Sequence, residues 1–178
     1  MPNVQNEIAD QDTKRFQAEL AFSDCLADSM VILDTSFAMH RGLECLVARD
    51  LLKPGRHSLF IPKKVLQELS RLRDKQTDPA ARFAENGLAL IYRLRDANMA
   101  HFDIVERPHQ YGYIADQAIV ELVNRHMKSR NLIVLTNDFA LTTAVLEISA
   151  VVKRRHSFSV YSWNDYNENF EYWCRGSV

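Results

Sequence analysis

The sequence lacks several features on which common functional classes depend. It has three cysteines, Cys25, Cys45 and Cys174, which are far apart and form no Cys-x-x-Cys pair. This argues against a structural zinc site and against a disulfide framework, and a reducing cytoplasm is the simplest compartment. No apolar run approaches the length of a membrane span, and the polar, acidic start of the chain is unlike a signal peptide. We therefore expect a cytoplasmic protein that does not contact a membrane.

An excess of charge of one sign is also missing. Lys and Arg number 22 against 23 Asp and Glu, so the formal net charge is -1 at pH 7. A protein that binds nucleic acid tightly and without specificity would show an excess of positive charge. The balance remains compatible with an enzyme that has a basic rim around an acidic centre. With 178 residues, 47% of them hydrophobic, the chain is long enough for one domain with a substantial core.

Glycine and proline number only five each, which argues against long flexible linkers, and short apolar runs alternate with longer amphipathic segments. We expect strands at residues 31–33, 58–61, 102–105, 132–135 and 158–161. We expect helices at residues 13–30, 37–52, 62–73, 79–95, 115–128, after residue 138, and at 164–173. Strands that alternate with helices form right-handed βαβ units and a parallel sheet. The predicted fold class is therefore α/β, with three α/β/α layers around a five-stranded, mainly parallel sheet.

The chain is predicted to have two parts. Residues 1–29 would form a polar tail and an extra helix, in which Phe16, Leu20 and Leu26 lie at helical spacing and pack on the main body. Residues 30–178 would form the main domain.

Acidic residues occur where this fold class binds its ligands. Two of the predicted buried strands run directly into polar clusters that contain Asp34 and Asp138. Ligands of open parallel sheets bind beyond the carboxyl ends of the strands. Asp116 begins a helix and lies at helical spacing from the apolar Ile119 and Val120, so its carboxylate is predicted to face inward. Glu68 lies on or beside the apolar stripe of its own helix. Four acids that are distant in sequence are thus predicted to converge.

Four carboxylates in one pocket repel and raise one another's pKa values, and no basic residue is an obvious buried counter-ion for all of them. Divalent cations resolve that conflict. Ligation by oxygen alone suits Mg²⁺ or Mn²⁺ rather than zinc, and such ions support an in-line attack on a phosphate group.

Each acid also has a simpler interpretation when it is taken singly. Asp34 and Asp138 could cap the helices that follow them, and Asp116 could complement a helix dipole. Glu68 could be half-exposed and form an ion pair with Arg71 or Arg73. Only the joint pattern favours a functional site.

Four segments of the sequence resemble the motifs of one family, the PIN domains. Residues 31–36, Val-Ile-Leu-Asp-Thr-Ser, resemble its opening strand, and residues 61–69, which contain Glu68, resemble its second motif. Residues 115–119 are similar to the third motif and residues 135–141, which contain Thr136 and Asp138, to the fourth. All four occur in the family's order and at compatible spacing, over about residues 30–162.

This resemblance implies a PIN-like fold and a Mg²⁺- or Mn²⁺-dependent endoribonuclease. The catalytic residues and metal ligands that it implies are Asp34, Glu68, Asp116 and Asp138. Ser36 and Thr136 match positions that support the acidic pocket by hydrogen bonds. The implied partners are an RNA substrate, an antitoxin or other protein, as for VapC-type toxins or RNA-processing and decay factors, and a second copy in a homodimer. The extra N-terminal helix and the basic segment Lys153 to Arg155 depart from the compact toxins.

An RNA substrate needs cations near the acidic pocket. The best candidates adjoin Glu68: Lys63, Lys64, Arg71, Arg73 and Lys75. His40, Arg41 and the cluster from Lys153 to His156 are further candidates, and Tyr111 and Tyr113 could stack on a base.

Two alternative functions remain open at this point. One is a catalytically silent module of the same fold that binds RNA or a protein partner. The other is a structure-selective DNA nuclease, for which the chain seems short of the DNA-binding extensions that such enzymes carry.

Overall fold

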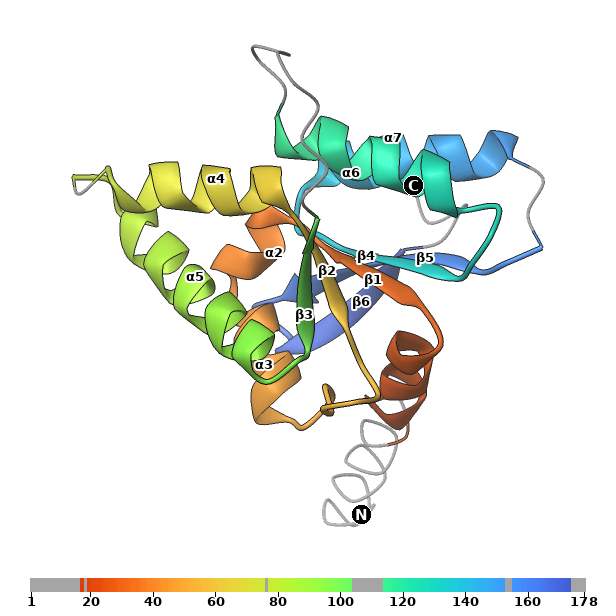
Figure 1. The fold of residues 1–178 in the computed structure, drawn as a ribbon, viewed down its shortest axis with the longest axis horizontal. Coiled ribbons are helices and arrows are strands. Elements are labelled where there is room, and N and C mark those ends of the chain that lie inside the picture. The colour runs from red at the N-terminus through yellow and green to blue at the C-terminus, as the bar shows by residue number, and fades with distance from the viewer. Residues whose placement is uncertain (1–16, 18, 76, 104–113, 153–154, 174–178) are drawn as a thin grey trace, which may run out of the picture.

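The computed structural model describes residues 17, 19–75, 77–103, 114–152 and 155–173 (Figure 1). In these segments a six-stranded sheet has the order β3-β2-β1-β4-β5-β6. Its strands are β1 (Met30–Leu33), β2 (Leu59–Pro62), β3 (Ala100–Asp103), β4 (Leu132–Leu135), β5 (Phe158–Asn164) and β6 (Asn169–Trp173). All neighbouring strands are parallel except β5 and β6, which pair antiparallel. The predicted α/β class with a mainly parallel sheet is confirmed.

The helices connect the strands and cover the sheet. They are α2 (Thr35–Met39), α3 (Arg41–Ala48), α4 (Lys63–Arg73), α5 (Ala80–Asp96), α6 (Ala115–His126) and α7 (Phe139–Val151), and residues 19–27 are also helical. In Figure 1, α6 and α7 lie above the strands, while α3 and the helix at residues 19–27 lie below them. The α4–α5 pair projects beyond the β3 edge. Among the described residues, no helix is long and apolar enough to cross a membrane.

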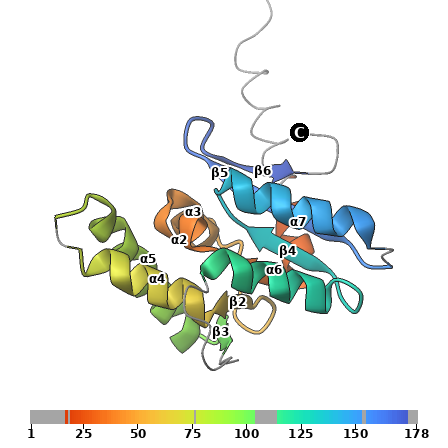
Figure 2. The same cartoon turned by 90° about the horizontal axis from the view of Figure 1, so that it is seen from above.

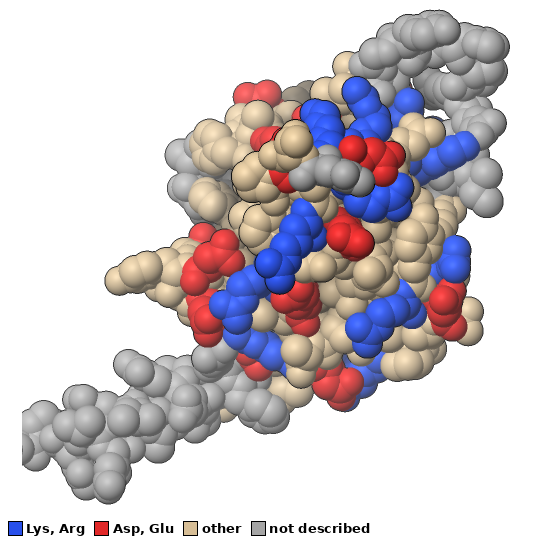
Figure 3. All heavy atoms as spheres, turned by 90° about the vertical axis from the view of Figure 1, so that its left-hand side faces the viewer, with Lys and Arg blue, Asp and Glu red and all other residues tan. Residues whose placement is uncertain are grey.

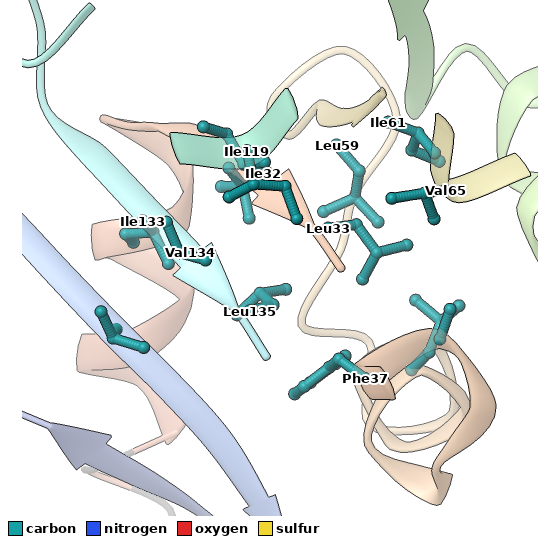
Figure 4. Packing of buried hydrophobic residues seen from close by; sticks show 14 of the residues in the cluster. Ile32, Leu33, Phe37, Leu59, Ile61, Val65, Ile119, Ile133, Val134 and Leu135 are labelled. Atoms are coloured by element: carbon teal, nitrogen blue, oxygen red, sulfur yellow. The ribbon is translucent and has the colours of Figure 1, made fainter. Parts of the chain in front are cut away.

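The core is built from strands that are apolar along their whole length. Every residue of β4 is buried, as are Val31, Ile32 and Leu33 of β1. Continuous burial is expected for the centre of a parallel sheet that is covered on both faces. Figure 4 shows these side chains meeting Val65 of α4 and Ile119 of α6. Because this core fixes the central strands, it also fixes the polar residues that follow them.

Several element boundaries differ from the sequence-based predictions by a few residues, and three differences change an element. The helix predicted at residues 37–52 is two helices, because the backbone at His40 is extended. The strand predicted at residues 102–105 is β3, which begins two residues earlier, and residues 104–105 lie outside the described residues. The short helix predicted at residues 164–173 was wrong. These residues form a turn and the strand β6, which adds a sixth strand to the predicted five.

The reason for this last error is local. Asn164 accepts hydrogen bonds from the backbone N–H groups of Tyr166 and Asn167, and Glu168 has a positive φ of 47°. Such side-chain bonds and left-handed conformations favour a turn over a helix. Trp173 then pairs with Val160 across the hairpin.

The helix at residues 19–27 packs on the same core. Phe22 and Leu26 are buried with the strands. His57 is also buried: its Nδ1 accepts the backbone N–H of Lys53 and its Nε2 lies 2.9 Å from the carbonyl oxygen of Ser23. The imidazole therefore joins this helix to the loop before β2, and it has a structural role that the sequence did not indicate.

Candidate metal centre

Asp34 follows β1 directly and is the N-cap of α2, with an exposed fraction of 2%. Its Oδ2 atom accepts hydrogen bonds from the Ser36 backbone N–H at 3.2 Å, from the Ser36 hydroxyl, and from the Thr136 hydroxyl at 2.8 Å. A buried carboxylate needs such donors to remain ionised. All three bonds fall on Oδ2, and no described residue donates to Oδ1. One oxygen is therefore used to hold the side chain in place and the other is left for a cation.

Asp138 follows β4 in the same way and is the N-cap of α7. Its Oδ1 atom accepts the backbone N–H of Leu141 at 3.0 Å, and its own backbone N–H donates to the Thr136 hydroxyl at 2.9 Å. Asn137 fixes the loop, because its amide accepts from the backbone N–H of Trp163 and donates to the carbonyl of the same residue. The capping interpretation is thus correct for both Asp34 and Asp138, and capping occupies one oxygen of each.

Glu68 lies in the second turn of α4 and does not pair with Arg71 or Arg73 in the structure. The Thr35 hydroxyl donates to its Oε2 atom at 2.8 Å, while Arg73 binds Asp74 instead. Thr35 is itself buried at the start of α2. The bond therefore ties Glu68 to the residue next to Asp34.

Asp116 shows that the four acids share one electrostatic environment. It is the second residue of α6 and lies at the helix N-terminus. Burial raises the pKa of the Asp116 carboxyl above its ordinary value, and the negative charges of Asp34, Asp138 and Glu68 raise it further. Charges raise a neighbouring carboxyl's pKa in this way only over short distances, so the three other carboxylates lie near Asp116. The structure brings the four predicted acids together around the starts of helices.

Figure 2 shows this arrangement from above: the starts of α4, α6 and α7 meet beside α2. The positive ends of the longer helices α6 and α7 favour the negative charges of Asp116 and Asp138. These dipoles do not neutralise the cluster, because burial and repulsion still dominate at Asp116.

The donor set fits a hard divalent cation. As the side chains stand, no group of three or more His, Cys, Asp or Glu among the described residues could hold a metal ion. Mg²⁺ fits this looser arrangement, since it keeps several of its waters and is usually bound by one or two carboxylates together with substrate phosphates. The second oxygens of Asp34, Glu68 and Asp138 accept no hydrogen bond from the described residues, so they remain for the ion or its waters.

The hydroxyl groups beside the acids were only partly anticipated. Ser36 and Thr136 were predicted to support the pocket, and both donate to Asp34, with their own oxygens 3.2 Å apart. The backbone N–H of Asn137 also donates to the Ser36 hydroxyl. The roles of Thr35 and Asn137 were missed, although both residues stand inside the motifs Asp-Thr-Ser and Thr-Asn-Asp.

The predicted RNA-binding cations lie along α4 and the turn after it. Lys63 and Lys64 are half-buried in its first turn, and Arg71, Arg73 and Lys75 are exposed. Figure 3 shows the side of the molecule formed by α4 and α5, where a band of Lys and Arg alternates with acidic residues. Lys64 and Arg71 lie at i−4 and i+3 from Glu68, so these two share its side of the helix.

Two of the other candidate cations are engaged in ion pairs with acidic side chains. His40 and Arg41 pair with Asp165 and Glu168, at 3.2 and 2.9 Å. Tyr111, Tyr113, Lys153 and Arg154 lie outside the described residues.

A groove of about 500 Å³ runs from Asp116 between α6 and α7. Val120 and Leu141 line it with the small Ala140 and Ala144, and Asp116 is the one member of the acidic cluster that lines it. An extended substrate in this groove would therefore reach the site at Asp116.

Comparison with known proteins identifies the type of domain. A family model described as "PIN domain" matches residues 31–151. A solved structure described as a domain of a functionally unknown protein from Methanocaldococcus jannaschii DSM 2661 is similar, with a TM-score of 0.51 and 21% identity over 73% of this chain and 90% of that chain. At that identity the likeness concerns the fold alone. A comparison with curated proteins found no match.

Proposed function

Because the chain belongs to the PIN-domain family, whose members are generally nucleases, we propose that it is a divalent-metal-dependent endoribonuclease. The observation that supports this most directly is the raised pKa of Asp116, which burial and three other carboxylates cause together. A cluster of this kind is unfavourable without a counter-charge. It becomes favourable when a cation and a phosphodiester are bound.

Asp34, Glu68, Asp116 and Asp138 would hold the ion, which we propose is Mg²⁺ or Mn²⁺. When bound, such an ion lowers the pKa of its water and stabilises charge on a phosphate oxygen. The protein's own groups orient the ligands. Ser36 and Thr136 hold Asp34, and Thr35 holds Glu68, each through a hydroxyl donor. Preorganised ligands of this kind spare the site the cost of reorganisation during reaction.

The cations of α4 would hold the substrate. Lys63 and Lys64 lie at the start of the helix, close to the carboxyl end of β2, and Arg71 lies one turn beyond Glu68. Phosphate contacts from these side chains would place the RNA backbone along α4 and its scissile phosphate at the acids. Each contact would add to the salt dependence of binding.

Mapping of cleavage sites on total RNA, with Mn²⁺, with Mg²⁺ and with chelator, tests the proposal. We expect cleavage by the wild type only with metal, and none by Asp34→Asn or Asp116→Asn. Parallel reactions on single-stranded DNA and flap DNA test which nucleic acid is the substrate. Cleavage by Asp116→Asn at the wild-type rate would exclude the assigned site, and faster cleavage of flap DNA than of RNA would replace the proposed substrate.

An antitoxin-type partner and a homodimer stay predictions. Measurement of the mass in solution tests the homodimer, and inhibition of RNA cleavage by a co-expressed protein tests the antitoxin.

A further inference from the structure

A second groove, of about 390 Å³, lies between the first turn of α7 and the β5–β6 hairpin. It starts at Thr136, the residue that donates to Asp34, and extends past Phe139 to Trp173 on β6. None of the four acids lines this groove, but it adjoins the candidate metal centre at Thr136 and at Phe139, the residue that follows Asp138. Figure 2 shows the hairpin beside the start of α7.

The polar groups of this groove are already bonded to one another. The Asn137 amide is used in both directions by the backbone of Trp163. Asn164 donates to Glu171 and accepts from two backbone N–H groups of the turn. Asp165 accepts from the indole N–H of Trp163 and pairs with His40. Because these groups are engaged, they are poorly suited to read the hydrogen-bonding edge of a base.

Unlike the polar groups, the apolar surface of the groove is still open to solvent at Phe139. Phe139 directly follows Asp138, yet 60% of its surface is exposed to solvent. Its ring meets Trp173 edge to face, with centroids 6.4 Å apart and an interplanar angle of 73°. The indole N–H of Trp173 donates to the Ser162 hydroxyl at 2.7 Å, which fixes the plane of the indole. One edge of the Phe139 ring is thus held by a fixed neighbour while much of the ring remains open.

The charged side chains of the groove indicate which kind of group can bind over the Phe139 ring. Asp165 and Glu171 line the groove, so a phosphate group placed inside it would be repelled. An uncharged, flat group is compatible with both the anions and the exposed ring. A nucleobase is such a group, and stacking on an aromatic side chain suits any base because every base has a π-face.

On the basis of the ribonuclease proposed above, we propose that Phe139 stacks on the base of a nucleotide beside the scissile phosphate. A paired base in an A-form helix is stacked between its neighbours and is not available to a side chain. Only an unpaired nucleotide can turn its base onto Phe139 while its phosphate lies at the carboxylates.

Binding of a fluorescein-labelled single-stranded oligoribonucleotide tests the stacking. The full chain with Asp116→Asn, in Mg²⁺, serves as background so that the RNA stays intact. We expect Phe139→Ala to weaken binding by about 5- to 100-fold, the range for loss of one base–aromatic stack. Phe139→Leu should weaken it similarly, because it retains apolar volume without a ring. Phe139→Tyr should retain affinity within about twofold.

Tyr172→Ala is the matched control. Tyr172 lies next to Trp173 on β6 and is 53% exposed, and it packs on Tyr161 at the other face of the sheet. It should bind RNA like the background protein. Unchanged affinity in Phe139→Ala, or full affinity in Phe139→Leu, would overturn the stacking role.

Cleavage by the otherwise wild-type protein tests whether the stack acts in the reaction. We expect Phe139→Ala to cut a single-stranded oligoribonucleotide more slowly than the wild type, by about the 5- to 100-fold expected for loss of one base–aromatic stack. An equal cleavage rate in Phe139→Ala and the wild type would refute this role. If the wild type does not cut RNA while Phe139→Ala still weakens binding, the proposed ribonuclease activity fails and the stacking surface stands.

Discussion

The hydroxyl of Thr136 donates to Oδ2 of Asp34 at 2.8 Å and so joins two residues that are 102 positions apart in the sequence. Asp34 ends β1 and Thr136 follows β4, and these strands are neighbours in the sheet. The same hydroxyl oxygen accepts the backbone N–H of Asp138. One buried threonine therefore sets the positions of two of the four acids relative to each other.

Replacement of this threonine separates its polar role from its packing role. Thr136→Val keeps the shape but leaves the Asp138 N–H without its acceptor and Asp34 without one donor. We expect the free energy of unfolding to fall by about 1–3 kcal/mol, the cost of unsatisfied buried groups. We also expect weaker Mn²⁺ binding. Urea denaturation and a Mn²⁺ titration followed by calorimetry measure the two effects.

Ser149→Ala is the control for that variant. Ser149 is buried on α7, the helix that Asp138 caps, and its hydroxyl donates to the carbonyl of Leu146. It should lose some stability and bind Mn²⁺ like the wild type. Equal loss of Mn²⁺ affinity in both variants would mean that Thr136 acts only through general stability.

Metal should stabilise the folded protein. A ligand that binds only the native state adds about 2.7 kcal/mol at a concentration of 100 times its Kd. We expect Mn²⁺ or Mg²⁺ to raise the melting temperature and chelator to reverse the rise. In Asp34→Asn and Asp116→Asn the metal should have little effect. An unchanged melting temperature of the wild type at millimolar metal would argue for a catalytically silent module that binds no metal.

The metal-free protein should gain stability from Asp116→Asn. Burial and three negative charges raise the pKa of Asp116, so its ionised form costs more free energy in the folded chain than in the unfolded chain. Removal of that charge should stabilise the metal-free fold by at most about 1 kcal/mol, because solvent screens the half-exposed group. Asp34→Asn should not, since Asp34 accepts three hydrogen bonds that its charge strengthens. Melting curves in chelator compare the two, and a lower melting temperature of Asp116→Asn would show that its charge is compensated.

The central strands and the positions of the acids were predictable because each depends on local sequence. A short apolar run such as residues 132–135 favours a strand covered on both faces, and the parallel topology then brings Asp34 and Asp138 to one edge. Helical spacing predicted that Asp116 faces inward and that Glu68 lies on or beside an apolar stripe, and the family resemblance named both as metal ligands.

The features of the fold and the site that were not predicted depend on contacts between residues that are distant in the sequence. The Thr35–Glu68 bond spans 33 positions, and nothing near Glu68 distinguishes Thr35 from Arg71 as its partner. The strand β6 exists because β5 offers it an edge, so a helical pattern at residues 164–173 was overruled by pairing. The exposure of Phe139 could also not be anticipated, since an aromatic residue after a strand is more often buried.

Gly87 tests how closely α5 must approach the site. A Cβ atom there would lie 2.6 Å from the carbonyl oxygen of Ala38 on α2, the helix that Asp34 caps. Gly87→Ala would gain about 1 kcal/mol of helix propensity if space allowed. We expect a net loss of about 1–3 kcal/mol because two backbones must separate, together with slower RNA cleavage. Urea denaturation measures the change in the free energy of unfolding. A more stable Gly87→Ala variant would mean that α2 and α5 can move apart without cost. Ala89→Gly, on the exposed face of α5, should lose only the propensity term.

Arg71 lies on the Glu68 side of α4 and is exposed. Among the described residues it has no ion-pair partner, whereas Arg73, two positions on, is bound to Asp74. If the RNA backbone follows this side of α4, Arg71→Gln should weaken binding and lower the slope of log K against log salt by about 0.7, the value for one phosphate on a single strand. Arg73→Gln is the matched control and should change the slope less. Binding measured over a range of KCl concentrations, with the Asp116→Asn background, tests both. A slope that falls equally in the two variants would mean that the RNA contacts the helix without preference for the side that bears Glu68.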